Sequence, residues 1–251
     1  MRCWEPGLRP VVSPAMFILM LACAVADPAA ETSAEVTQTE AAFRRTQYAG
    51  TTERLKADRT ALSKRYLAAS STEKHKVLAE SRTRVLDALT REIFPFWEGT
   101  PWSFYGSTQV PQEGEIACGY FVSTTLRDAG FRVERVRLAQ QASSLIIESL
   151  TGAQDTLWLG ADVEKVVSRI EKEEEALWVV GLDYHVGYLW HHDQTTTFCH
   201  SSYLGAATVV CEDARTSPAM VSNVHVIGKL FDDEMMDRWL REKKFSTVVS
   251  N

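Results

Sequence analysis

The fold of this chain is decided by residues 99–130, GTPWSFYGSTQVPQEGEIACGYFVSTTLRDAG. Turn-forming and aromatic residues open the stretch, and apolar residues then recur at three- and four-residue steps from Cys118 onward. This spacing predicts an amphipathic helix that starts at Cys118 and stops at Gly130. The positive end of a helix dipole favours a thiolate in the first turn, so we expect a lowered pKa and a nucleophilic Cys118. A cysteine that is only a small buried apolar residue is the alternative.

The chain after this helix changes from helical to strand-like periodicity. Residues 131–136 suit a short edge strand, and residues 138–150 and 161–174 suit helices. Apolar or β-branched runs joined by short turns then predict strands at residues 176–180, 185–190, 195–200, 208–211 and 224–230. Residues 232–243 predict a closing helix with Asp232 or Asp233 near its cap. Helices followed by an antiparallel sheet indicate an α+β fold.

Four of the six histidines fall between residues 185 and 200. A hairpin centred on His192 and Asp193 would place His185 directly opposite His200, with Cβ atoms about 4.5–5.5 Å apart. A nucleophilic thiol needs a base within hydrogen-bond reach and a polar group that orients the base. Cys118, His185 and His200 can supply these three roles in that order. No spacing typical of a zinc site is present, so we expect neither a metal nor another cofactor.

The N-terminal part of the chain predicts export. Residues 1–26 combine two arginines, an apolar run and an A-x-A cleavage site, which is the pattern of a secretion signal. A lipoprotein signal, with membrane anchoring through a lipid on Cys23, is the second interpretation. Residues 27–40 contain almost no large apolar residues and predict a disordered tether. Residues 41–94 predict a helical hairpin that ends at Pro95 and serves as a packed or spacing appendage, with partner binding as the alternative.

Charge and cysteine content narrow the function classes. The net charge is −6 with an isoelectric point near 5.6, and no run rich in Lys and Arg is present. Nucleic acid is therefore not expected as a partner. Cleavage after residue 26 would leave three cysteines, of which Cys199 and Cys211 lie in neighbouring strand-like runs and could pair, leaving Cys118 free. Three reduced and buried cysteines are the other interpretation.

Together these motifs resemble the NlpC-type papain-fold cysteine peptidases, a superfamily of bacterial cell-wall endopeptidases. The matching segments are GTPWSFYG at residues 99–106 for the family's G-x-P-Y-x-W-G-G, ACGY at 117–120 for D-C-S-G, HVGY at 185–188 for H-V-G-I, and His200 at the third polar position. The resemblance covers roughly residues 97–230. Trp102 stands in the place of a tyrosine, and Ala117, Gly119 and Tyr120 replace the residues that flank the family's cysteine.

The resemblance implies a papain-like core at residues 95–251, in which a nucleophile helix packs on an antiparallel sheet. It implies that the cysteine and the two histidines form a triad that hydrolyses an amide in peptidoglycan stem peptides, in the periplasm or cell envelope. Trp102, Tyr105 and Gly119 are then the candidates for substrate or oxyanion binding. A non-catalytic envelope scaffold with the same fold and an acyltransferase that forms the same thioester are the alternatives.

Overall fold

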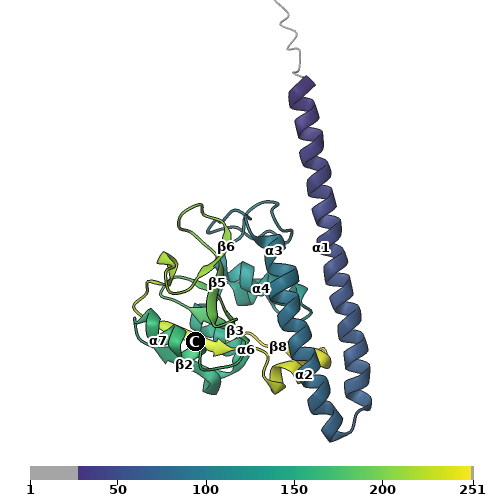
Figure 1. The fold of residues 1–251 in the computed structure, drawn as a ribbon, viewed down its shortest axis with the longest axis vertical. Helices are drawn as coiled ribbons and strands as arrows, with labels where there is room; N and C mark the ends of the chain where they lie inside the picture. Colours follow the sequence, from purple (N-terminus) through teal and green to yellow (C-terminus); the bar gives the residue numbers. More distant parts are fainter. Residues whose placement is uncertain (1–27, 250–251) are drawn as a thin grey trace, which may run out of the picture. The chain divides into compact units, whose positions relative to one another are not determined.

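The computed structural model describes residues 28–249 (Figure 1). The chain divides into two units, residues 1–40 and 41–251, and the fold below is that of the second unit. The predicted secretion signal, including the alternative lipidation site Cys23, lies outside the described residues. Helix α1 spans Pro28–Ala68, so residues 28–40 are helical where the sequence predicts a tether. Three alanines and three glutamates, both strong helix formers, lie in this segment and account for the difference.

A helical region precedes the sheet. It contains α1 after residue 40, α2 (Ser71–Asp87), the π-helical segment η1 (Ala88–Ile93) and the single turn α3 (Phe94–Trp97). The Ser70 N–H donates to the Glu73 carboxylate at 3.0 Å, which fixes the start of α2. Pro95 does not end the region as expected, because it lies in the first turn of α3, where a missing N–H is tolerated.

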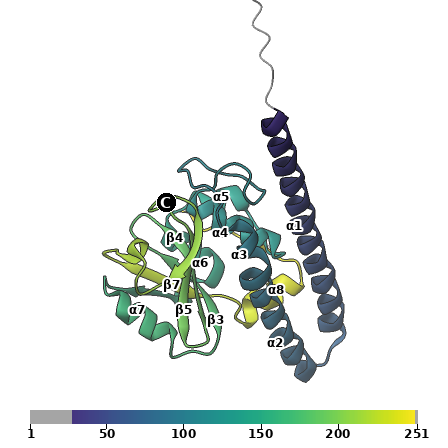
Figure 2. The ribbon, with the colours of Figure 1, turned by 45° about the horizontal axis from the view of Figure 1, so that its top comes forward.

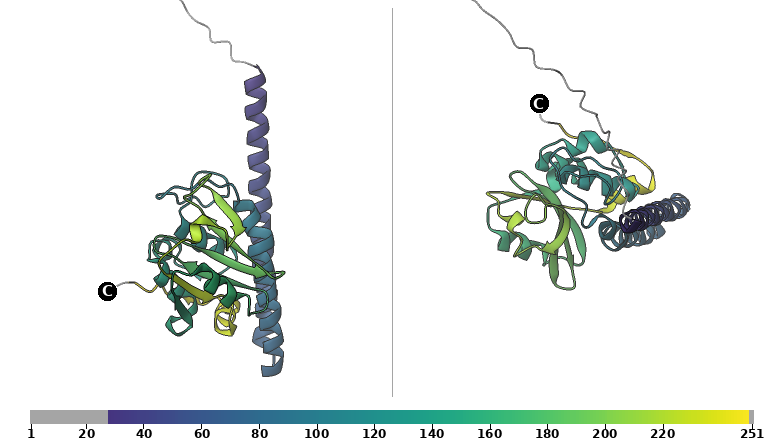
Figure 3. Two further views of the ribbon diagram at one scale, coloured as in Figure 1. Left: turned by 60° about the vertical axis from the view of Figure 1, so that its left-hand side comes forward. Right: turned by 90° about the horizontal axis from the view of Figure 1, so that it is seen from above.

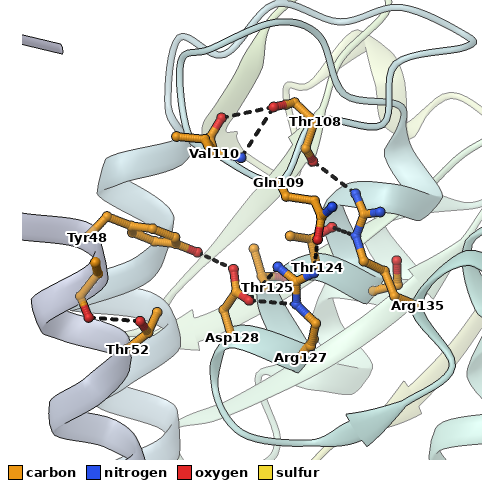
Figure 4. Close-up of polar contacts among 12 residues, drawn as sticks. Tyr48, Thr52, Thr108, Gln109, Val110, Thr124, Thr125, Arg127, Asp128 and Arg135 are labelled. Atoms are coloured by element: carbon orange, nitrogen blue, oxygen red, sulfur yellow. Dashed lines mark hydrogen bonds and ion pairs between the residues drawn. The ribbon is translucent and has the colours of Figure 1, made fainter. Parts of the chain in front are cut away.

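The helical region shares a hydrophobic core with the rest of its unit, since Leu55 of α1 and Leu89 of η1 belong to the same buried cluster as Phe121. A polar contact joins the two parts as well. The Tyr48 hydroxyl donates to the Asp128 carboxylate at 2.6 Å (Figure 4). Asp128 ends α4 (Cys118–Asp128), the helix that begins with the candidate nucleophile. The region is therefore packed against the part of the chain that carries the cysteine.

The main sheet of the described residues is antiparallel and has the strand order β2-β7-β3-β4-β5-β6. Its strands are β2 (Thr156–Leu159), β3 (Ala176–Gly181), β4 (Val186–His192), β5 (Thr195–Ser201), β6 (Val209–Asp213) and β7 (His225–Lys229). The sequence predicts all of these except β2, a short strand that pairs only with β7 at the edge of the sheet. A helical region followed by an antiparallel sheet confirms the α+β class.

The hairpin of β4 and β5 differs from the expected register. Its turn is formed by Asp193 and Gln194, both with positive φ (46° and 60°), which suits a two-residue hairpin turn. The predicted turn lies one residue earlier in the chain. Opposite residues are therefore displaced by two positions, and every side chain keeps its predicted face. Tyr188 pairs with Cys199, so His200 lies across from Gly187 instead of His185. A Cβ added to Gly187 would accordingly approach the His200 Cβ to 2.7 Å.

Helices cover both faces of the sheet (Figures 2 and 3). Helices α4 and α6 (Ser143–Thr151) contact one face, and α7 (Val163–Ile170) packs on the other with Trp178 and Val180. The predicted helix at residues 138–150 is two helices, α5 (Arg135–Ala139) and α6.

Two short strands lie outside the main sheet. The predicted edge strand at residues 131–136 is reduced to β1 (Arg132–Val133), which pairs in parallel with β8 (Lys244–Phe245). Between them in the sequence, α8 (Asp233–Leu240) is capped by the Asp232 side chain, which accepts from the Met235 N–H at 2.6 Å. None of the described helices has the length and apolar character needed to cross a membrane.

Candidate active site

Cys118 begins α4 where the preceding loop ends. Ala117, the residue before it, has an extended backbone, and its N–H donates to the Gly106 carbonyl at 2.9 Å. The Phe121 N–H donates to the Ala117 carbonyl at 2.9 Å, closing the first turn of the helix. Cys118 is half-buried as a residue, and the backbone N–H of Val186 is close enough to its sulfur to favour the thiolate. The sulfur therefore lies at the end of the sheet where β4 begins.

The pKa of the Cys118 thiol is raised, which is opposite to the expectation from the helix dipole. Burial disfavours the thiolate, and this effect exceeds that of the backbone N–H groups of Val186, Gly119 and Cys118 itself, which favour it. The resting site consequently holds a neutral thiol. Such a thiol becomes a strong nucleophile only when a base removes its proton during attack.

Two buried histidines meet at this end of the sheet. His185 lies directly before β4 and His200 lies in β5, and both residues are buried. His185 Nε2 lies 2.7 Å from His200 Nδ1. Burial lowers the pKa of both rings from 6.5 to about 3, and the neighbouring His200 adds to the effect on His185. The pair predicted from the sequence is present, through a diagonal contact and with both rings neutral at pH 7.

A carboxylate that the sequence analysis missed continues this chain of contacts. Glu212 Oε1 in β6 lies 3.2 Å from His200 Nε2, and the Ser217 hydroxyl donates to the same carboxylate oxygen. In the ladder of β5 and β6, His200 pairs with Val210, so Glu212 lies two residues further along β6 on the same face. Pairing the two cysteines of these strands in the sequence would have revealed this diagonal neighbour.

These contacts define one consistent arrangement of protons. An ionised Glu212 only accepts hydrogen bonds, so His200 carries its proton on Nε2 and presents a lone pair at Nδ1. His185 then donates from Nε2 to that lone pair, which leaves its own Nδ1 unprotonated. Within the described part of the chain, His185 Nδ1 is buried and has no hydrogen-bond partner. This nitrogen is free to accept a proton from a neighbouring group.

Two cavities, of about 400 and 510 Å³, open beside the cysteine. Both are lined by Cys118, Gly119, Tyr184 and His185, so the sulfur and the candidate base face the same space. The site therefore has room for a ligand in two cavities that both reach Cys118.

The three candidates for substrate or oxyanion binding all lie at these cavities. Trp102 and Tyr105 line the larger cavity, Trp102 half-buried and Tyr105 exposed. Gly119 lies in the first turn of α4, and a Cβ at this position would come within 2.2 Å of the Ala139 carbonyl oxygen. Its missing side chain lets α5 pack directly against the turn that holds the sulfur.

The other described cysteines are paired with each other, and His191 has a hydrogen-bond partner outside the site. Cys199 and Cys211 form a disulfide between β5 and β6, which leaves Cys118 as the free cysteine of the described chain. His191 contacts the Thr195 carbonyl at 2.9 Å. No group of three or more His, Cys, Asp or Glu side chains within residues 28–249 is arranged to hold a metal ion.

Comparisons of the chain with protein-family models, with curated proteins and with solved structures find no match. The chemistry of the site is therefore inferred from its own residues.

Proposed function

We propose that the protein is a thiol-dependent amide hydrolase, with Cys118 as nucleophile, His185 as base and His200 as the residue that orients the base. The observation that carries the proposal is the state of His185. Its ring is fixed through Nε2, its Nδ1 is unpartnered, and it lines the same two cavities as the free cysteine. A nucleophile, a base and a group that orients the base are the parts that acyl transfer requires.

In the first step, the Cys118 sulfur forms a bond to the amide carbonyl carbon while its proton moves to His185 Nδ1. The imidazolium that results donates from Nε2 to His200, and His200 donates from its own Nε2 to Glu212. Both hydrogen bonds exist before the reaction. We call the hydrogen bonds from His185 through His200 to Glu212 the relay. The relay can stabilise the new positive charge without rearrangement.

The carbonyl oxygen becomes an oxyanion when the sulfur attacks. The N–H groups in the first turn of a helix have no carbonyl partner within the helix, so those of Cys118 and Gly119 can donate to this oxyanion. His185 returns its proton to the leaving nitrogen as the C–N bond breaks, and a thioester on Cys118 remains. Water then attacks the thioester with His185 as base, releasing the carboxylic acid and the thiol.

The finer fold assignment belongs to the same proposal. A nucleophile helix on an antiparallel sheet, with one histidine directly before β4 and the other in the adjacent strand β5, supports a papain-like core of the NlpC type. Export is what the signal-like segment at residues 1–26 predicts, and a periplasmic or envelope location with a peptidoglycan stem peptide as substrate is what the sequence resemblance predicts. These three points remain predictions.

Acylation by a small p-nitrophenyl ester tests the proposal. We expect the full chain to release p-nitrophenolate and to carry the acyl group on Cys118, as read by mass spectrometry, and the Cys118→Ala variant to do neither. A wild-type protein whose Cys118 reacts with iodoacetamide but is never acylated would support the non-catalytic scaffold. Preferential transfer of the acyl group to an added amine, in place of water, would support the acyltransferase.

A further inference from the structure

Exposed aromatic side chains gather around the candidate nucleophile. Six aromatic side chains of the described residues are exposed, and five of them line the two cavities beside Cys118: Phe104, Tyr105, Trp158, Tyr184 and Tyr203. Tyr184, next to the candidate base, is 94% exposed. Large apolar groups that are left in contact with water and clustered at one place mark a binding surface.

The two cavities present different apolar walls. The smaller one is lined by the aliphatic side chains of Ile146, Leu182, Val224 and Val226, with Trp158 beside them. The larger one is lined mainly by rings, which are Trp102, Phe104, Tyr105, Tyr120, Tyr184 and Tyr203. An amide bound at the sulfur would thus direct one flanking group toward aliphatic surface and the other toward aromatic surface.

The aromatic wall is held in place by contacts of its own. The backbone N–H of Trp102 donates to the Ala207 carbonyl at 2.7 Å, and the ring centroids of Trp102 and Tyr203 lie 6.0 Å apart. Tyr203 also contacts the His185 ring edge to face, with 5.5 Å between centroids. The wall and the candidate base are therefore parts of one packed arrangement.

Charged groups able to pair with an ionic substrate are missing from this surface. Among the described residues that line the two cavities, none is Lys or Arg, and the single carboxylate is Asp183. Asp183 already accepts from the backbone and the side chain of Asn223 at 2.8 and 2.7 Å. An ionised substrate group would lose water here without gaining a partner of opposite charge.

The guanidinium behind the aromatic wall is also engaged. Arg135 lies over the Tyr120 ring, 4.8 Å from its centroid. Its Nε donates to the Thr124 hydroxyl, and its terminal nitrogen donates to the carbonyls of Ser107 and Thr108 (Figure 4). These bonds hold the loop that contains Ser107 and Thr108, and Arg135 does not line either cavity.

We infer that the substrate is an uncharged peptide with an apolar side chain on each side of the scissile amide, one of them aliphatic and the other aromatic. This inference rests on the proposed function and narrows its substrate. The stem peptides that the sequence resemblance predicts carry free carboxylates, so the two substrate classes separate in an experiment.

Three matched peptidyl acyloxymethyl ketones provide that experiment, because such inhibitors alkylate a cysteine only after they bind beside it. The three differ in the residue that carries the reactive ketone, which is Leu, Glu or Lys, and all share the same aromatic carboxylate, on the other side of the reactive carbon, as leaving group. The second-order rate of labelling at Cys118 of the full chain is read by mass spectrometry. We expect the Leu inhibitor to react at least ~100-fold faster than the Glu and Lys inhibitors.

Variants of the exposed rings test the surface itself. Tyr184→Ser and Trp158→Ser should each slow the Leu inhibitor by at least ~10-fold and leave the iodoacetamide rate unchanged. Phe43→Ser, which removes an exposed ring that lines neither cavity, should change neither rate. Loss of the iodoacetamide rate in either cavity variant would mean that the variant disturbs Cys118 itself and would overturn this assignment of the surface.

The outcomes separate the inference from the proposed function. Equal rates for the three inhibitors, or a faster Glu inhibitor, would overturn the uncharged substrate while the thiol chemistry stands. Labelling by iodoacetamide but by none of the inhibitors, together with failure of the ester assay, would remove the proposed function and the inference with it.

Discussion

Replacing Glu212 with glutamine tests the relay behind the candidate base. The carboxylate lies 3.2 Å from His200 Nε2 and would balance the positive charge that forms on His185 during attack. Hydrogen bonds that involve a charged group contribute ~1.5–3 kcal/mol, against ~0.5–1.5 kcal/mol for neutral ones. The Glu212 side chain is 32% exposed, so solvent screens part of this difference. The midpoints of the two ranges differ by about 1.2 kcal/mol, and roughly 1 kcal/mol remains after screening, which corresponds to an acylation rate that is about fivefold lower.

The assay is the single-turnover release of p-nitrophenolate, measured at neutral pH together with the unfolding midpoint in urea. Glu212→Gln should lower the acylation rate about fivefold, because glutamine keeps the shape but not the charge. Glu80→Gln is the matched control, since it removes an ion pair with Arg65 on the helical region. A Glu212→Gln rate within about twofold of wild type, with the fold intact, would refute the relay.

Three further predictions concern packing, buried polar contacts and pH. Gly119→Ala should lower the free energy of unfolding by ~1–3 kcal/mol and the acylation rate with it, because the new Cβ meets a carbonyl oxygen at 2.2 Å. Gly50→Ala in α1, where the new Cβ has no other atom closer than 3.8 Å, should instead raise the free energy of unfolding by ~0.5–1 kcal/mol in the same urea assay. Tyr48→Phe should lower the free energy of unfolding by ~1–3 kcal/mol, because it leaves the buried Trp97 indole N–H without a partner and removes one hydrogen bond from Asp128, which keeps its ion pair with Arg127. Tyr105→Phe on the surface should change it by no more than about 0.5 kcal/mol. The pKa of both His185 and His200 is about 3 in the folded chain, below the 6.5 of an unfolded chain. Their contribution to the free energy of unfolding is therefore complete above pH 6.5 and is lost as the pH falls toward 3. Between pH 7 and pH 5, each histidine should lower the free energy of unfolding, measured in urea, by about 2 kcal/mol. His185→Gln should remove about half of the combined loss. A variant whose stability responds to pH as wild type does would contradict this prediction.

The sequence predicted the strands better than the details of the helices. Alternating and continuous apolar runs in the sequence predict five strands of the main sheet correctly. They do so because strand residues that are buried against the core must be apolar. The edge strand Thr156–Leu159 was missed, since it is short and pairs on one side only. Helix ends were less predictable, as the break between α5 and α6 shows, because packing of α5 against Gly119 is a tertiary effect.

The histidine pair was predictable although its register was not. Hairpin register depends on the turn, and a displacement of two positions leaves the same side chains on the same face. His185 and His200 consequently meet even though they are not directly opposite. Glu212 was missed because its contact with His200 depends on a third strand.

The pKa of the Cys118 thiol could not be predicted from its position in the helix alone. A position in the first turn of a helix favours a thiolate, but the folded chain buries the sulfur, and burial has the larger effect on its pKa. This difference changes the expected chemistry from a resting thiolate to a thiol that is activated by a base.

The most direct test of the central claim compares acylation and alkylation of Cys118 across pH in wild type and His185→Ala. Since the resting thiol is neutral, iodoacetamide alkylation should be slow at pH 7 and should rise only above the usual thiol range. Acylation by the p-nitrophenyl ester should nevertheless proceed at pH 7 in wild type and fall at least ~100-fold in His185→Ala. Equal acylation rates in the two proteins, or none in wild type, would contradict a Cys118–His185 pair that performs acyl transfer.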